Sequence, residues 1–206
     1  KKQANNGSSS GIVSQSSSTN NDDDDDDENM TAVGQAAYDY TCYPTEGGHT
    51  DFAPRNSVEG ELLDYLRAKF ASEGSAERIS NERVVAGSGI PHVYEFLSQR
   101  FPDMVNKAVH AEIARAEDLK AACIAKHSND GGDALCRKTM DIFLTHYGSE
   151  VGNCCLKWCP TGGLFITGGL TPKNIARIQN PNDLFLPAVF AKGRVSIAVT
   201  QCPIYA

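Results

Sequence analysis

The stretch GGLFITGGLTP, residues 162–172, constrains the fold more than any other part of this chain. Its apolar run LFIT lies between two glycine pairs, a pattern typical of a short buried strand. Thr171 and Pro172 follow the second pair, Gly168 and Gly169, and predict the start of a helix. This order places backbone N–H groups beside the carboxyl end of a strand, where open α/β sheets bind nucleotides. We therefore predict an α/β fold.

Capping signals and apolar periodicity on either side of this stretch predict further helices and two more strands. Asn56 and Glu59 form a capping pair ahead of an apolar helical stripe at Leu62, Leu66 and Phe70. Helices are predicted over about 57–71, 106–127 and 134–158. A further helix is predicted to begin after a cap at Ser88 or Gly89, with Pro91 in its first turn. Strands are predicted over 38–43 and 195–200.

The N-terminal stretch is rich in Ser, Asn and Asp and offers few apolar side chains to bury. We predict that residues 1–37 form a disordered insertion or linker and that residues 38–206 form one domain. The seven acids at positions 22–28 account for the whole net charge of −7, since 19 acids and 19 basic residues remain without them. The rest of the chain is near neutral, so charge indicates neither a nucleic-acid partner nor a membrane surface.

The cysteines and the absence of a long apolar run bear on the compartment. No apolar run has the length of a membrane span, and no charged-then-apolar leader is present. Seven cysteines, an odd number, without a secretory signal predict reduced thiols in the cytoplasm. Cys154, Cys155 and Cys159 lack the paired spacing of a zinc site, so we expect them to pack as small hydrophobic side chains.

The stretch TEGGHTDFAP, residues 45–54, places an acid and an imidazole on either side of a glycine pair. Glu46 and His49 could face water on a turn for which the glycines supply a positive φ, or they could bind a ligand with hydroxyl groups. Glu82 lies shortly before a predicted helix, where the helix dipole alone would favour a carboxylate. The residues themselves leave these alternatives open.

Four separated motifs resemble a known family in the same chain order. EGGHTDFAP, SNERVVAGSGI, GGLFITGGLTP and VFAKGRVSIAVTQCPIYA are similar to the second half of the bacterial-type glucokinases, a family of ATP-dependent hexokinases. The similarity covers about residues 44–206. It implies a ribonuclease-H-like, actin-like large domain with a mixed sheet and packed helices, here truncated at both ends.

The resemblance also implies roles for particular residues. Glu46, His49 and Glu82 match the family's sugar-binding side chains, and Gly168 and Gly169 match its adenosine-side glycine pair. Thr171 would then cap the next helix, although a glycine pair after a strand is by itself more often a tight turn. The run of Lys192, Gly193 and Arg194 also matches a family run, and we read it as a surface turn before the last strand.

No catalytic residue is expected in this chain. The family's DxGGT loop, its Asn-Asp pair with the catalytic base and its GTGLG loop all precede EGGH, and none is present here. The sequence SNDGGD follows EGGH and is read as a polar turn between helices. We therefore expect a glucokinase fragment, inactive alone, whose parent transfers the γ-phosphoryl group of ATP to the 6-hydroxyl of glucose with Mg²⁺. Two alternatives are a non-catalytic sugar sensor and a kinase for another hexose; a homodimer is left open.

Overall fold

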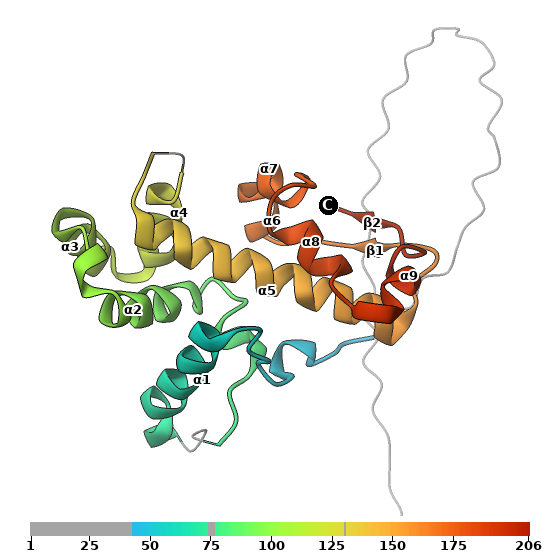
Figure 1. The fold of residues 1–206 in the computed structure, drawn as a ribbon, viewed down its shortest axis with the longest axis horizontal. Coiled ribbons are helices and arrows are strands. Elements are labelled where there is room, and N and C mark those ends of the chain that lie inside the picture. Colours follow the sequence, from blue (N-terminus) through green and yellow to red (C-terminus); the bar gives the residue numbers. More distant parts are fainter. Residues whose placement is uncertain (1–42, 74–76, 130) are drawn as a thin grey trace, which may run out of the picture. The chain divides into compact units, whose positions relative to one another are not determined.

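A helix of 25 residues, α5 (Ala134–Trp158), is the element around which the other helices pack (Figure 1). It begins where the side chain of Asp133 accepts a hydrogen bond of 2.8 Å from the backbone N–H of Cys136, and it ends two residues before Pro160. These bounds confirm the helix predicted over 134–158. The polar turn predicted before it is confirmed as well, with Gly131 at a φ of +77°.

The computed structural model describes residues 43–73, 77–129 and 131–206. The tract predicted to be disordered lies outside the described residues, as does the strand predicted over 38–43 apart from Tyr43. The six cysteines within the described part of the chain are free thiols. None of the helices in these ranges is both long and apolar enough to cross a membrane.

The N-terminal half of the described chain forms four helices. Asn56 caps the first helix through its side chain, which accepts from the N–H of Glu59 at 3.0 Å, as the capping pair predicted. Leu62, Leu66 and Phe70 are buried, so the predicted apolar stripe is confirmed. The four helices are α1 (Ser57–Lys69), α2 (Ile90–Arg100), α3 (Lys107–Arg115) and α4 (Lys120–His127).

The single helix predicted over 106–127 is wrong. A short 3-10 helix at Glu117–Leu119 separates α3 from α4, and Glu117 takes a positive φ of 44°. An alanine-rich run has high helix propensity throughout, so its sequence gives no strong signal for this break. The break folds α4 back against α3, and the two helices are in contact.

The C-terminal half packs closely on α5. Short helices α6 (Leu170–Lys173), α7 (Ile175–Ile178), α8 (Phe185–Phe190) and α9 (Ser196–Val199) follow one another. The helices α5 and α8 approach each other closely, because a Cβ built on Gly148 would lie 2.2 Å from the carbonyl oxygen of Phe185. Glycine at this position therefore permits the two backbones to meet.

The sheet of the described residues is small. β1 (Leu164–Phe165) pairs in parallel with β2 (Ile204–Tyr205), with Leu164 opposite Ile204. The strand predicted in LFIT is thus present but only two residues long. Helices and a two-stranded sheet coexist, so the described residues form a helix-rich α/β arrangement. Both strands run in the same direction, so this sheet is parallel and not mixed as predicted.

The strand predicted over 195–200 is wrong. The chain there forms a 3-10 helix, Gly193–Val195, and then α9. Ser196 directs this turn, because its hydroxyl donates to the carbonyl oxygens of Phe190 and Gly193, both at 2.7 Å. The strand β2 follows a few residues later.

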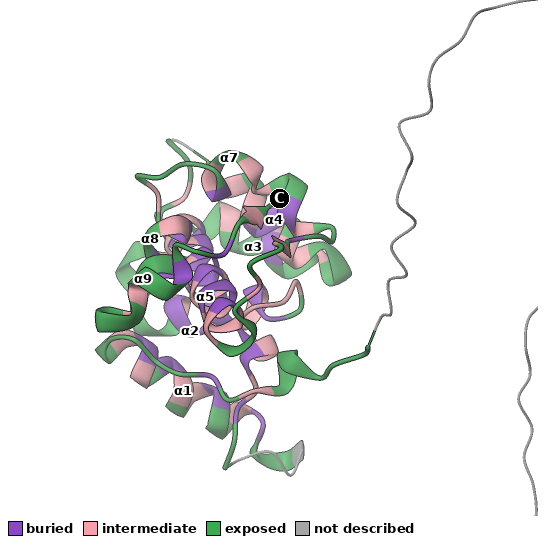
Figure 2. Cartoon of the chain, turned by 90° about the vertical axis from the view of Figure 1, so that its right-hand side faces the viewer, coloured by how far each residue is buried: buried purple, intermediate pink, exposed green. Residues whose placement is uncertain are grey.

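One connected core lies around α5. Helices α2, α4, α8 and α9 all contact it, and the buried residues concentrate along α5 and its neighbours (Figure 2). A buried pair of polar side chains lies within this core, where His146 Nε2 of α5 is 3.0 Å from Glu59 Oε2 of α1. This pair ties the start of α1 to the middle of α5.

Candidate functional site

The EGGH segment forms one turn of 3-10 helix, Gly47–His49, with Glu46 at its N-cap position. The backbone N–H of His49 donates to the carbonyl oxygen of Glu46 at 2.9 Å. Neither glycine takes a positive φ, so the interpretation that the pair supplies this conformation is wrong. The missing side chains instead keep the surface open towards Glu82, since a Cβ on Gly48 would lie 3.8 Å from Glu82 Cβ.

The structure brings Glu46, His49 and Glu82 together. His49 Nε2 lies 3.6 Å from Glu46 Oε2, and His49 Nδ1 lies 3.4 Å from Glu82 Oε1. The exposed fractions of these side chains are 88% for Glu46, 52% for His49 and 42% for Glu82. The imidazole therefore lies between two carboxylates that remain accessible to a ligand.

A backbone contact between two distant segments explains this meeting. Asp51 and Ser80 form an antiparallel bridge, and the N–H of Asn81 donates to the carbonyl oxygen of Thr50 at 2.7 Å. Phe52 beside the bridge is buried and anchors it in the core. Glu82 follows on a 3-10 helix, Asn81–Arg83, and so projects next to the EGGH turn.

A pocket of about 420 Å³ opens beside this cluster. This volume lies in the range of roughly 300–1,000 Å³ that is typical of ligand pockets. Glu82, Gly47 and Gly48 line it, whereas Glu46 and His49 are not part of its wall. The full lining is Thr45, Gly47, Gly48, Asn81, Glu82, Val85, Tyr147, Glu150, Val151, Cys154, Leu164, Phe165, Ile166 and Thr167.

Two polar residues of this pocket were missed by sequence reasoning. Glu150 projects from α5, where its Oε2 accepts from Asn153 Nδ2 at 3.0 Å and from Asn81 Nδ2 at 3.4 Å. Asn81 is itself buried. A glutamate inside a long helix carries no signal that distinguishes it from an ordinary surface residue, so only the fold brings Glu150 to the pocket that Glu82 also lines.

Gly168 and Gly169 connect β1 to α6, as the strand and glycine pattern predicted. Gly168 takes a φ of +96°, which favours glycine, and a Cβ on either residue would meet no atom within 4 Å. The predicted cap at Thr171 is wrong, because the N-cap is Gly169 and no side chain caps the helix. Thr171 is buried instead, and its hydroxyl is hydrogen-bonded to that of Tyr147 at 3.0 Å.

A second pocket, of about 520 Å³, begins directly after the glycine pair. Thr167 before the pair lines the first pocket and Leu170 after it lines the second, so the glycines lie between the two. The second pocket is lined by Gly87, Ser88, Ile90, Pro91, Glu117, Asp118, Leu119, Lys120, Ala121, Ala122, Ala125, Met140, Leu170, Lys173 and Asn174.

Lys192 does not belong to a simple surface turn before a strand. It is half-buried, and its Nζ donates to the carbonyl oxygen of Ser149 at 2.8 Å and to Asn153 Oδ1 at 2.6 Å. Burial and the charge of Arg55 lower the pKa of Lys192. Gly193 and Arg194 are exposed, as expected for a turn.

The cysteines at the end of α5 differ in their surroundings. Cys155 is buried and packs as predicted, and Cys154 is half-buried. Cys159 is exposed at the C-cap with a φ of 43°, so its predicted packing is wrong. Within residues 43–73, 77–129 and 131–206, the one group of three potential metal ligands is Glu112, Cys123 and His127.

That group does not fit Mg²⁺. This ion prefers oxygen ligands in octahedral geometry, whereas the group includes a thiol and an imidazole. It also shares no residue with the wall of either pocket described above. This group of the described residues is therefore unsuited to Mg²⁺.

Comparisons with known proteins agree with one another. The family model described as Glucokinase matches residues 30–206. The glucokinase of Trichormus variabilis is 38% identical over 176 residues, which cover 81% of this chain and 49% of that protein. The glucokinase of Nostoc punctiforme is 39% identical over 176 residues, covering 81% of this chain and 50% of that protein. The chain thus spans about half the length of these curated relatives.

Solved structures show the same similarity. The crystal structure of a glucokinase from an Antarctic psychrotroph superposes with a TM-score of 0.61 at 28% identity, covering 78% of this chain and 44% of that one. The glucokinase of Balamuthia mandrillaris in complex with glucose, at 19% identity and a TM-score of 0.60, shares the fold over 79% of this chain and 42% of its own. Because the family model matches residues 30–206, which make up most of the chain, the chain belongs to the glucokinase family.

Proposed function

We propose that the protein phosphorylates glucose and that this chain supplies its sugar-binding surface. The observation that carries the proposal is the cluster of Glu46, His49 and Glu82 beside a pocket of about 420 Å³. The transferred group is the γ-phosphoryl of ATP, and the product is glucose 6-phosphate, as the family resemblance implies. On the same ground we place the reaction in the cytoplasm, at the entry to glycolysis.

The chemistry of the cluster suits a sugar with several hydroxyl groups. Carboxylates accept hydrogen bonds, and a neutral imidazole both donates and accepts, so together they satisfy hydroxyls that do both. Each hydrogen bond to a charged group contributes about 1.5–3 kcal/mol. His49 Nε2 lies 3.6 Å from Glu46 Oε2 and His49 Nδ1 lies 3.4 Å from Glu82 Oε1, so the three side chains present these groups together beside the pocket.

Specificity follows from the same contacts. A sugar that lacks a hydroxyl, or that directs it away, leaves a desolvated polar group without a partner. Glu82 and Glu150 both line the pocket, so we propose that they bind two different hydroxyls of the same ring. Glu150 extends the predicted sugar-binding set by one residue.

We propose that ATP approaches from the side of Gly168 and Gly169. The glycines carry no side chain that would hold a nucleotide away from the backbone, and the pocket of about 520 Å³ beside α6 would receive the adenosine. The catalytic base and the phosphate-binding loops are not among the residues of this chain that we assign. Its own contribution is to bind and orient the two substrates within a ribonuclease-H-like, actin-like large domain.

Calorimetric titration of the chain with glucose tests the sugar site. We expect saturable binding with one site per chain, and a loss of affinity of about tenfold or more in Glu82→Gln, because one charged hydrogen bond is removed. Glu77→Gln removes an exposed carboxylate outside the pocket and is the matched control. Equal binding by Glu82→Gln and Glu77→Gln would show that the site is not used.

Competition and turnover separate the alternatives. Mannose and fructose present their hydroxyls differently from glucose, so their affinities report whether another hexose is the substrate. Binding of glucose without phosphorylation, measured on the protein that also carries the phosphate loops, would indicate a sugar sensor. Phosphorylation of glucose by that protein supports the kinase.

A further inference from the structure

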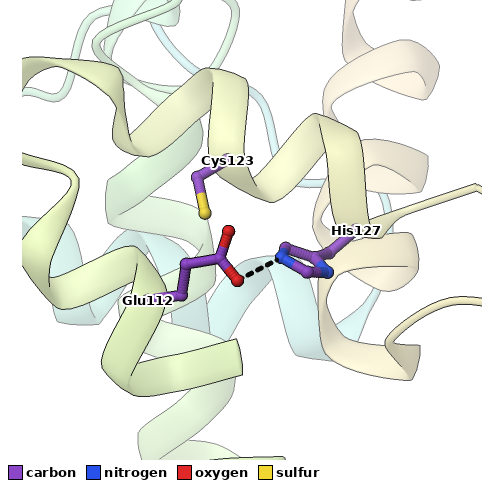
Figure 3. Close-up of side chains that lie close together, drawn as sticks. All are labelled: Glu112, Cys123 and His127. Atoms are coloured by element: carbon purple, nitrogen blue, oxygen red, sulfur yellow. Dashed lines mark hydrogen bonds and ion pairs between the residues drawn. The ribbon is translucent and has the colours of Figure 1, made fainter. Parts of the chain in front are cut away.

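We infer that α3 and α4 form a site for a zinc-type divalent metal ion, with Glu112, Cys123 and His127 as its ligands (Figure 3). Each residue offers one ligand atom, and these atoms all lie within 4.8 Å of one another. The site lies outside the lining of the sugar pocket, and it does not depend on the proposed function.

The helices place the three side chains by simple geometry. Cys123 and His127 are four residues apart on α4, so they project from the same face of the helix. Glu112 projects towards them from α3, across the break at Glu117–Leu119 (Figure 3). A metal ion bound here would therefore join two helices that the chain already folds against each other.

The ligand chemistry favours zinc over the hard cations. Thiolate and imidazole bind Zn²⁺, whereas Ca²⁺ and Mg²⁺ take oxygen ligands. Three protein ligands leave the fourth tetrahedral position to water or to an outside ligand. A cavity of about 380 Å³, lined in part by Glu112 and Cys123, provides the room for it.

The metal-free arrangement already orients the carboxylate. Glu112 Oε2 lies 2.9 Å from His127 Nε2, and Glu112 Oε1 accepts from Lys126 Nζ at 2.9 Å. A metal ion bound to His127 Nε2 and to one oxygen of Glu112 replaces the contact between these two side chains. The S–H bond of Cys123 breaks, its proton goes to solvent, and a bond from sulfur to the metal forms. The ammonium group of Lys126 pairs with the same carboxylate and repels the metal cation, so it opposes metal binding.

Titration of the intact chain with Co²⁺, followed by Zn²⁺, tests this site. We expect one Co²⁺ per chain, with the ultraviolet absorption of a cobalt–thiolate bond, and displacement by Zn²⁺. Cys123→Ser should abolish the absorption, and His127→Gln should weaken binding by at least about tenfold. Cys154→Ser, a half-buried cysteine on α5, is the matched control and should bind like the unmodified chain.

Lys126→Met gives a test that misfolding cannot imitate. It removes the opposing ammonium group while keeping an unbranched side chain, so Co²⁺ affinity should rise. Circular dichroism of each variant reports whether the helices are retained. The inference is overturned if no cobalt–thiolate absorption appears at one equivalent, if it survives in Cys123→Ser, or if Lys126→Met leaves the affinity unchanged.

Discussion

Replacing Gly148 by alanine tests the close packing of α5 on α8. The added Cβ would lie 2.2 Å from the carbonyl oxygen of Phe185, 3.0 Å from its carbonyl carbon and 3.2 Å from Ala188 Cβ. Two of these atoms are backbone atoms, which cannot rotate away, so the helices must separate. Such overpacking costs about 1–3 kcal/mol, against a gain of about 1 kcal/mol from the helix propensity of alanine.

The clash should therefore outweigh the propensity. We expect the free energy of unfolding of Gly148→Ala to fall by up to about 2 kcal/mol, or a Tm lower by several degrees, at about 2–4 °C per kcal/mol. Thermal unfolding followed by circular dichroism measures this change. Gly60→Ala on α1 is the matched control, because its added Cβ would meet no atom within 4 Å and should stabilise the chain. Equal stabilisation by both variants would refute the packing of α5 on α8.

Three further predictions concern charged groups. Burial raises the pKa of Glu59, but the hydrogen bond and charge of His146, together with hydrogen bonds from Arg55 and Asn56, outweigh this and hold the pKa below the ordinary value of 4.5. The ionised Glu59 therefore stabilises the fold above pH 4.5, and this contribution is lost as the pH falls through the lowered pKa. Between pH 6 and pH 3, the free energy of urea unfolding should change less in Glu59→Gln than in the unmodified chain. An equal pH dependence of the two proteins would contradict this. Arg177 donates to Asp183 at 2.8 and 2.9 Å and to Asp141 at 2.6 Å. Arg177→Met should therefore lower the free energy of urea unfolding by about 1–3 kcal/mol. An unchanged free energy of unfolding would show that these half-buried pairs contribute nothing to stability. His49→Ala should weaken glucose binding in a calorimetric titration without changing Tm, since the imidazole is half exposed; a large fall in Tm would assign it a structural role instead.

Local signals in the sequence predicted the long helices well. The polar turn before Ala134 and the break at Pro160 bound α5, and the pair of Asn56 and Glu59 defines the start of α1. Each of these signals acts between residues a few positions apart. The same is true of the glycine turn after β1, where Gly168 takes a positive φ.

Elements that depend on distant partners were predicted less well. Alternating apolar residues at Val195, Ile197 and Val199 resemble a strand, but only Val199 is buried and Ile197 is 72% exposed. Packing of α9 against α5 and α8 decides the conformation there. Tertiary contacts override the local pattern at such positions.

The candidate site shows the same division. The spacing of Glu46 and His49 indicated a tight turn, and the turn is present as a 3-10 helix. The meeting of His49 with Glu82 depends on a bridge between Asp51 and Ser80, for which the sequence carries no signal. The family resemblance, and no local rule, joined these residues into one predicted site.

A crystal structure with glucose bound tests the central claim most directly. The account predicts the sugar in the pocket of about 420 Å³, with a carboxylate oxygen of Glu82 at about 2.5–3.0 Å from a sugar hydroxyl. It also predicts Glu150 beside a second hydroxyl of the same ring. Glucose bound elsewhere, or a pocket that stays empty at saturating glucose, would contradict the assignment of this sugar site.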